Sequence, residues 1–410
     1  MDRHINKSQQ QKILHCFLLE PNIYISAVMT LKRKRDVSVE EIKEAVEKAY
    51  TKNETTMSKI VLDNNEIYFE NMSETGCKVF IEQRDWVDIL HENEKKTFKI
   101  NEGELVRTFI IDGKDDSVCV FIMAHHIVGD GHSLVLLAQD ILSCLAKETV
   151  EYKPLNNDNE EMLPSSVKCS FLVKAIINYL NRQWRKNGKI FTWEDYFKVH
   201  NKFWKNRQSH IEKTVISEEL QEIKANSKRI GVTVNSYIIA KQMEKTPEYE
   251  TVGIPISYRG KNRSLANKVI VIRMKYKYDK NISFEENAKK IHKIIQKILE
   301  NPSKKYFISK SIKSFELGLM DGVLLAKHTG YQNKAAKKAT GLMGMSEKNQ
   351  THLAVTNLGN IDLKTEYDSF RLQEFDAIAA SMSTTKDVIA LCTIENRMTI
   401  CFSSVGKSGV

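Results

Sequence analysis

The chain is organised around Val118-Cys119-Val120-Phe121-Ile122-Met123-Ala124-His125-His126-Ile127-Val128-Gly129-Asp130-Gly131-His132-Ser133. Its first seven residues are apolar, rich in β-branched and aromatic side chains, and end at a turn signal, which predicts a buried strand. Residues 134–145 are Leu-rich and free of Gly and Pro, which predicts a buried helix. A strand thus carries two histidines into a glycine-punctuated turn, from which a helix leaves.

The two histidines are neighbours on a strand, so their side chains point to opposite faces. His125 and His126 therefore cannot both face one substrate or hold one metal ion. We expect one to face the site and the other to pack behind it with a hydrogen bond. The alternative is a satisfied pair of core histidines beside an aspartate that caps the helix. No C-x-x-C pair occurs in the sequence, and we expect no metal site.

The pattern His-His-x-x-x-Asp-Gly, between a buried strand and a helix, resembles the signature of the chloramphenicol acetyltransferase-like superfamily. This group includes nonribosomal-peptide condensation domains and stand-alone alcohol acyltransferases. The resemblance implies an α/β (α+β) fold whose two lobes form a V around a central tunnel. We expect an N-terminal lobe over residues 1–165, which carries the motif, and a C-terminal lobe over residues 166–410. A polar stretch with two prolines, residues 151–166, predicts the linker between them.

The resemblance also implies roles for single residues. The second histidine, His126, would be the catalytic one, supported by His125 and Gly131. Asp130 would pair with an arginine from the other lobe, or else orient the histidine. The segment 254–259, Ile-Pro-Ile-Ser-Tyr-Arg, is similar to the strand-ending "Pro-x-x-x-Arg" of condensation domains, which makes Arg259 the expected partner. Arg263 is the second choice, and a solvated arginine at a strand end is an equally good reading of either.

A second segment, Thr356-Asn357-Leu358-Gly359, is similar to the "Ser/Thr-Asn-x-Gly" segment that faces the histidine in stand-alone members. The amide of Asn357 or the hydroxyl of Thr356 could there donate to an oxyanion. The alternative is a turn asparagine before a glycine. The plant-type Asp-Phe-Gly-Trp-Gly motif is absent, which argues against that branch.

An imidazole with a near-neutral pKa suits general-base catalysis on a hydroxyl or an amine. Acyl transfer from a thioester needs no covalent acyl-enzyme, and the chain lacks the Gly-x-Ser-x-Gly elbow of serine hydrolases. We therefore expect an acyltransferase with a small alcohol or amine acceptor and no permanently bound cofactor. The donor would be acyl-coenzyme A or an acyl carrier protein, both of which present phosphopantetheine thioesters.

Two rival functions remain open at this point. One is a free-standing condensation enzyme that joins carrier-bound substrates. The other is a non-catalytic module that docks a carrier protein. We favour acyl-coenzyme A because one two-lobed transferase accounts for all 410 residues. The basic stretch 326–349 is expected to be an exposed connection, and it supplies candidates for phosphate contacts: Lys327, Lys334, Lys337 and Lys338.

Composition narrows the class of partner. The formal net charge of +10 fits an anionic partner, while the lack of a dense Lys/Arg run with aromatics argues against nucleic acid. No apolar run approaches the roughly 20 residues that span a bilayer, and the first residues do not form a signal peptide. Seven scattered cysteines indicate a reducing compartment, so we expect a cytoplasmic protein. We also expect a monomer.

Overall fold

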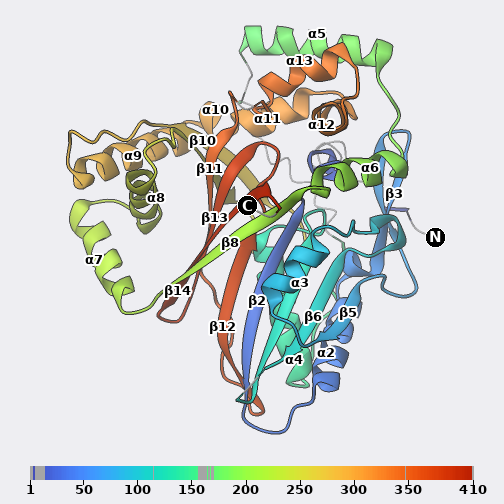
Figure 1. The fold of residues 1–410 in the computed structure, drawn as a ribbon, viewed down its shortest axis with the longest axis vertical. Helices are drawn as coiled ribbons and strands as arrows, with labels where there is room; N and C mark the ends of the chain where they lie inside the picture. The colour runs from blue at the N-terminus through green and yellow to red at the C-terminus, as the bar shows by residue number, and fades with distance from the viewer. Residues whose placement is uncertain are drawn as a thin grey trace.

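Two large β-sheets, each covered by helices, form the two lobes of the molecule (Figure 1). The computed structural model describes residues 3–4, 14–113, 115–155, 164, 167, 170–346 and 348–408. The first sheet has the strand order β12-β2-β7-β6-β5, and the second has the order β10-β9-β11-β13-β14-β8. A smaller sheet has the order β1-β4-β3. The predicted α/β class with two lobes is confirmed.

The first lobe surrounds the motif strand. Its sheet consists of β2 (Tyr24–Arg33), β5 (Lys78–Glu82), β6 (Val106–Asp112), β7 (Ser117–His125) and β12 (Phe370–Ala379). Its helices are α2 (Val39–Thr51), α3 (Trp86–Asn93) and α4 (Gly131–Leu145), and the small sheet beside it consists of β1 (Arg3–His4), β3 (Ser58–Asp63) and β4 (Glu66–Asn71). Because β7 lies in the middle of its sheet with both faces covered, it is apolar throughout rather than alternating.

The second lobe has a sheet of six strands with three helices against it. The strands are β8 (Arg207–Ile216), β9 (Thr251–Ser257), β10 (Val269–Lys275), β11 (Thr351–Asn360), β13 (Thr385–Ile394) and β14 (Arg397–Lys407). The helices are α7 (Glu219–Ile230), α8 (Val234–Lys245) and α9 (Phe284–Leu299). A further helical layer lies at the top of Figure 1 and contains α5 (Phe171–Asn187), α10 (Pro302–Lys305), α11 (Phe307–Ser314), α12 (Leu319–Thr329) and α13 (Lys334–Leu342), while α6 (Trp193–Trp204) lies below it at the right.

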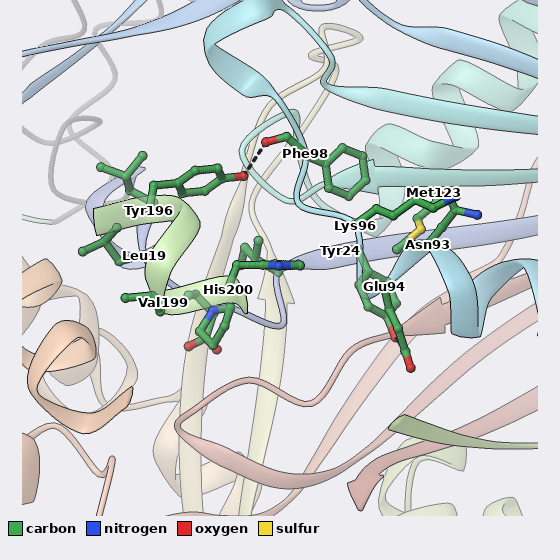
Figure 2. A pocket seen from close by; sticks show the side chains of 14 residues that line it. Leu19, Tyr24, Asn93, Glu94, Lys96, Phe98, Met123, Tyr196, Val199 and His200 are labelled. Atoms are coloured by element: carbon green, nitrogen blue, oxygen red, sulfur yellow. Dashed lines mark hydrogen bonds between the residues drawn. The ribbon is translucent and has the colours of Figure 1, made fainter. Parts of the chain in front are cut away.

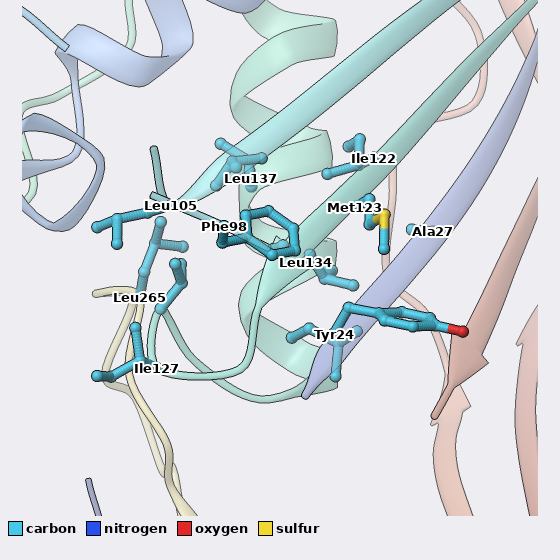
Figure 3. Close-up of a cluster of buried hydrophobic side chains, with 14 of the residues drawn as sticks. Tyr24, Ala27, Phe98, Leu105, Ile122, Met123, Ile127, Leu134, Leu137 and Leu265 are labelled. Atoms are coloured by element: carbon cyan, nitrogen blue, oxygen red, sulfur yellow. The ribbon is translucent and has the colours of Figure 1, made fainter. Parts of the chain in front are cut away.

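Two segments of the C-terminal half reach into the first lobe. Strand β12 pairs antiparallel with β2, from Phe370 opposite Arg33 to Ala379 opposite Ile25. The connection between β9 and β10, residues 258–268, inserts Leu265 into the first core beside Ile127 (Figure 3). The expected lobe boundary at residue 165 lies outside the described residues, and most of the expected linker does too. Because β12 follows residue 165 in sequence and pairs with β2, the first sheet is completed by a strand from beyond the expected boundary.

The expected exposed connection over residues 326–349 is wrong. The end of α12 and all of α13 occupy it. Helix α13 forms because Asn333 caps it, accepting from the N–H groups of Ala335 and Ala336, and because small side chains bury one face. The many lysines of that stretch led to the prediction of an exposed connection instead of this short amphipathic helix.

Several other elements depart from the simplest sequence pattern. Strand β8 is mostly exposed, so it lacks the apolar pattern that predicts a strand, yet it pairs with β14 along ten residues. Helix α7 begins at Glu219 with no side-chain cap. Helices α11 and α12 are separate, with Gly318 at φ 76° between them. Within the described residues, no helix is long and apolar enough to cross a membrane.

Candidate active site

The motif forms the turn between β7 and α4. The backbone N–H of His126 donates to the carbonyl of Ile23 at 2.8 Å, which ties the turn to the start of β2. Asp130 caps α4, because its Oδ1 accepts from the N–H of Ser133 at 3.1 Å. The sequence thus anchors the turn at both ends with hydrogen bonds.

The glycine after the aspartate permits a close approach between the lobes. A Cβ on Gly131 would lie 2.8 Å from Cδ2 of Leu358, a residue of β11. A larger residue at this position would push the second lobe away from the turn. Gly131 therefore supports the site through packing.

The structure places His125 behind the turn. Its side chain is completely buried and lies edge-on to Phe98, with ring centroids 5.8 Å apart. Its Nδ1 accepts from the N–H of Ile127 at 3.2 Å. Burial first, and then nearby positive charge, lowers the pKa of His125 to about 3, so this ring is neutral.

A small cavity lies near His125, behind the active-site turn. It has a volume of about 10 Å³, room for about one water molecule, and its lining includes Tyr24, Glu94 and His200 (Figure 2). The hydroxyl of Tyr196 donates to the carbonyl of Phe98 at 2.9 Å at its edge. A cavity of this size holds no organic substrate.

His126 faces the opposite way and lines a much larger cavity of about 940 Å³. Its ring stacks on Phe17, with centroids 4.6 Å apart and planes 11° from parallel. The side-chain amide of Asn267 donates to the carbonyl of His126 at 2.7 Å. Burial lowers the pKa of His126, and this outweighs the upward influence of Asp130 and Asn267. The imidazole is therefore neutral at physiological pH, the form that accepts a proton.

Phe17 was not predicted from the sequence as a site residue. It lies in a helical turn, residues 14–18, that two long-range contacts hold in place. His15 hydrogen-bonds the buried Asp321 of α12. Both carboxylate oxygens of Glu20 accept from the N–H of Ser383 at 3.1 Å. No local motif marks Phe17, because the contacts that position it come from the far end of the chain.

Asp130 and Arg259 form an ion pair across the lobes, with Nη2 2.7 Å from Oδ1. Both side chains are buried, with 3% and 8% of their surfaces exposed. Arg259 also donates from Nη1 to the carbonyl of Ser264 at 2.7 Å, and Oδ2 of Asp130 accepts from the N–H of Lys268 at 2.8 Å. The structure therefore brings the expected pair together. Arg263 donates instead to Gln139, at the surface.

The large cavity runs between the lobes. Thr356 and Asn357 line it together with His126, so residues far apart in sequence face one space. Oδ1 of Asn357 accepts from the N–H of Gly359 at 2.8 Å, in the manner of a turn asparagine. Its amide nitrogen is the group left to act as a donor. The rest of the lining is mostly apolar and comes from β2, β9, β10, β11, β12, β13, α5 and α11 and from the segment that follows α13.

The basic side chains of the cavity are not the expected ones. Lys327 donates to the carbonyl of Ser383 at 2.6 Å, and the three lysines of α13 are not among the lining residues. The basic residues that line the cavity are Arg273, Lys275, Lys313 and Lys348. The first two share one face of β10 with Val271, and this period of two was the available signal.

Comparison with solved structures gives the same architecture over nearly the whole chain. The first condensation domain of the CDA synthetase superposes with a TM-score of 0.62 at 10% identity, covering 98% of this chain and 90% of that one. This chain has the condensation-domain fold. The SgcC5 protein from Streptomyces globisporus, in complex with a naphthyl ethanediol and sucrose, matches with a TM-score of 0.60 at 11% identity, covering 98% and 93%.

Polyketide synthase associated protein 5 from Mycobacterium tuberculosis is similar as well. Its TM-score is 0.56 at 12% identity, and the match covers 98% of this chain and 92% of that one. No family model and no curated protein matches the sequence. At these identities the similarity establishes the fold, and the function must be argued from the site.

Proposed function

We propose that this protein is an acyltransferase that moves an acyl group from a phosphopantetheine thioester to a hydroxyl or amine, with His126 as general base. One observation carries the proposal: a neutral, half-buried imidazole lines a cavity of about 940 Å³ between two lobes of the condensation-domain fold. A cavity of this size accommodates a pantetheine arm and an organic acceptor together.

The reaction needs few groups. His126 removes the proton from the acceptor hydroxyl or amine as that atom attacks the thioester carbonyl. The carbonyl oxygen becomes an oxyanion, and the amide nitrogen of Asn357 is our candidate donor to it. When the C–S bond breaks, the imidazolium returns its proton to the leaving thiolate. Asp130 and Arg259 bond each other and the backbone, so we assign them to holding the turn rather than to proton transfer.

We propose acyl-coenzyme A as the donor. Its phosphates would meet the basic residues of the cavity, of which Arg273 and Lys275 project from one face of β10. The rival is a donor tethered to a carrier protein. It is supported by relatives of this fold that are condensation domains of synthetases.

Replacing His126 by alanine tests the chemistry. Free-thiol release from acyl-coenzyme A, with pooled alcohols and amines, should fall by about 10²–10⁴-fold while the melting temperature is kept. His292→Ala on α9 is the matched control, because that residue lies in the second lobe and bonds Ser236. Full activity of the His126 variant would refute the assignment, and transfer abolished by either histidine change would point to a general loss of structure.

A comparison of donors tests the second half of the proposal. The same acyl group is offered on coenzyme A, on a truncated pantetheine and on an acyl carrier protein. We expect turnover with coenzyme A and poorer turnover with pantetheine, with a gap that narrows as salt screens the phosphates. Arg273→Gln and Lys275→Gln should raise KM for coenzyme A but not for pantetheine. Turnover with the carrier-bound donor alone would favour a free-standing condensation enzyme.

A further inference from the structure

Positive charge is concentrated in one helical layer. Helices α5, α10, α11 and α13, which we call the basic helices, contain eleven lysines and arginines and no aspartate or glutamate. The formal net charge of the whole chain is +10, and the positive charge of these four helices is at least as large. They lie together at the top of the molecule, where α5 packs against α13 (Figure 1).

Large apolar side chains project from the same layer. We call the following residues the mouth cluster, with their exposed fractions: Phe171 84%, Leu172 73%, Leu342 56%, Phe307 46% and Ile176 45%. They come from three of the basic helices, α5, α11 and α13. A contiguous patch of exposed apolar side chains usually marks an interaction surface.

The mouth cluster surrounds an opening of the active-site cavity. Ile176, Phe307 and Leu342 are at once substantially exposed and part of the cavity lining. Phe171 and Leu172 lie on the preceding turn of α5 and extend the apolar surface outward. Whatever covers this surface therefore also faces the entrance to the cavity.

We propose that this face docks on an anionic lipid bilayer, with the mouth cluster inserted at the level of the headgroups. Lysines and arginines around apolar residues on surface helices are the pattern of interfacial membrane binding. Phe171 and Leu172 project from the end of a helix with 84% and 73% of their surfaces exposed, which suits a deformable lipid surface better than the fitted contour of a protein partner. Arg185 of α5 pairs with Glu316 at 2.9 Å, but the four basic helices themselves contain no carboxylate, and such an excess of positive charge suits a uniformly anionic surface.

Docking in this way gives the cavity a lipophilic entrance. A substrate or product with a long hydrocarbon chain can then pass between the bilayer and the cavity through the apolar ring. This inference does not depend on acyl transfer, because it concerns the surface and the opening rather than the chemistry. It is tested by binding alone, so its failure would leave the proposed function standing.

Vesicle flotation with the full chain measures docking. The probes are vesicles of phosphatidylcholine, with and without phosphatidylglycerol. We expect binding to the anionic vesicles, little binding to the neutral ones, and weaker binding as salt is added. Lys334→Glu/Lys337→Glu/Lys338→Glu should weaken binding about a hundredfold, since each basic residue near the surface contributes several-fold. Phe171→Ser/Leu172→Ser should also weaken it.

Matched controls distinguish the effect of this face from a general effect of net charge or of exposed apolar residues. Lys224→Glu/Lys228→Glu reverses two exposed lysines of α7, and Ile81→Ser removes an apolar residue of β5 that is 44% exposed. Both should bind as the unaltered chain does, and all variants should keep its melting temperature. Equal binding by the mouth-cluster variants, or no binding of the unaltered chain to anionic vesicles, would overturn the proposal. The proposal would also be overturned if the unaltered chain did not bind vesicles but bound a purified acyl carrier protein, and the Lys334/Lys337/Lys338 variant lost that binding.

Discussion

His126 owes its protonation state to burial rather than to a charged partner. Burial lowers its pKa, and the carboxylate nearest in sequence, Asp130, is already engaged by Arg259. The ring is covered on one side by Phe17. The structure therefore supplies a base that stays unprotonated without a dedicated acid partner.

The Phe17 stack should set the acid limb of the activity profile. A general base works unprotonated, so the rate falls as pH drops through its pKa, here below the ordinary histidine value of about 6.5. Phe17→Ala lets water reach the ring, which should move that limb to higher pH and lower kcat. The pH dependence of kcat/KM measures both effects. Phe80→Ala, at an exposed strand residue, is the control, and an unmoved limb in Phe17→Ala would show that stacking does not govern the pKa.

Asp130 and Arg259 should be coupled in stability. Removing either partner leaves a buried charge alone, at a cost of about 3–5 kcal/mol. Asp130→Asn/Arg259→Gln should cost much less than the sum of the two single changes, as denaturant unfolding in a double-mutant cycle would show. Arg263→Gln at the surface is the control and should change stability little. Additive costs for the pair would mean that the 2.7 Å contact contributes no coupling.

At the scale of elements, β12 is the strand that joins the halves of the chain. It forms an edge of the first sheet although it lies some 340 residues beyond β2 in sequence, between β11 and β13 of the second sheet. Phe375 in β12 is completely buried in the first core. The first sheet thus depends on late chain for part of its packing.

Phe375→Ala should destabilise the protein by about 3–5 kcal/mol, because a large side chain leaves a filled core. The loss should reach both lobes, since β12 bonds β2 while its flanking strands belong to the second sheet. Hydrogen exchange read separately on β2 and β11 would show it. Phe80→Ala on β5, the opposite edge of the same sheet, is matched in residue type but is 40% exposed. Protection unchanged in β2 would mean that β12 is dispensable to the first sheet.

At the scale of the whole molecule, the contact of Glu20 with Ser383 is one of several that join the two halves of the chain, in addition to β12 and the 258–268 loop. Glu20 is 2% exposed, and the contact joins residues 363 positions apart. Lys327 and His328 lie on the same cluster, each bonded to Ser383. Burial raises the pKa of Glu20 to about 7.

Glu20 should therefore make stability pH-dependent. Because its folded pKa is raised, its contribution is greatest below the unfolded value near 4.5 and is lost as pH rises towards 7, about 3 kcal/mol in all. Glu20→Gln removes this titration, so the variant should gain stability relative to the unaltered chain between pH 4.5 and 7. Denaturant unfolding at a series of pH values measures the difference. A difference that does not vary with pH would place the folded pKa at its ordinary value.

The sequence alone determined what rests on local pattern. The strand–turn–helix form of the motif was predictable because its parts follow one another in the sequence: the apolar run into His125, the turn glycines and the helix after them. The facing of His125 away from His126 follows from local strand geometry in the same way. Arg259 could be named because it ends a strand in a segment with a resemblance.

Only the tertiary structure decided what depends on distant chain. Phe17, which stacks on His126, and Asn267, which donates to the His126 carbonyl, come from segments whose own sequences carry no mark of the site. Arg273 and Lys275 share one face of β10, but only the fold shows that this face lines the cavity. Strand β8 and helix α13 were missed because their exposed or basic faces hide the pattern, and β12 joins the first sheet although its sequence does not name its partner. The physical reason is the same for these residues and elements. Burial and pairing between remote segments are properties of the folded chain, whereas local periodicity records only which face of an element is apolar.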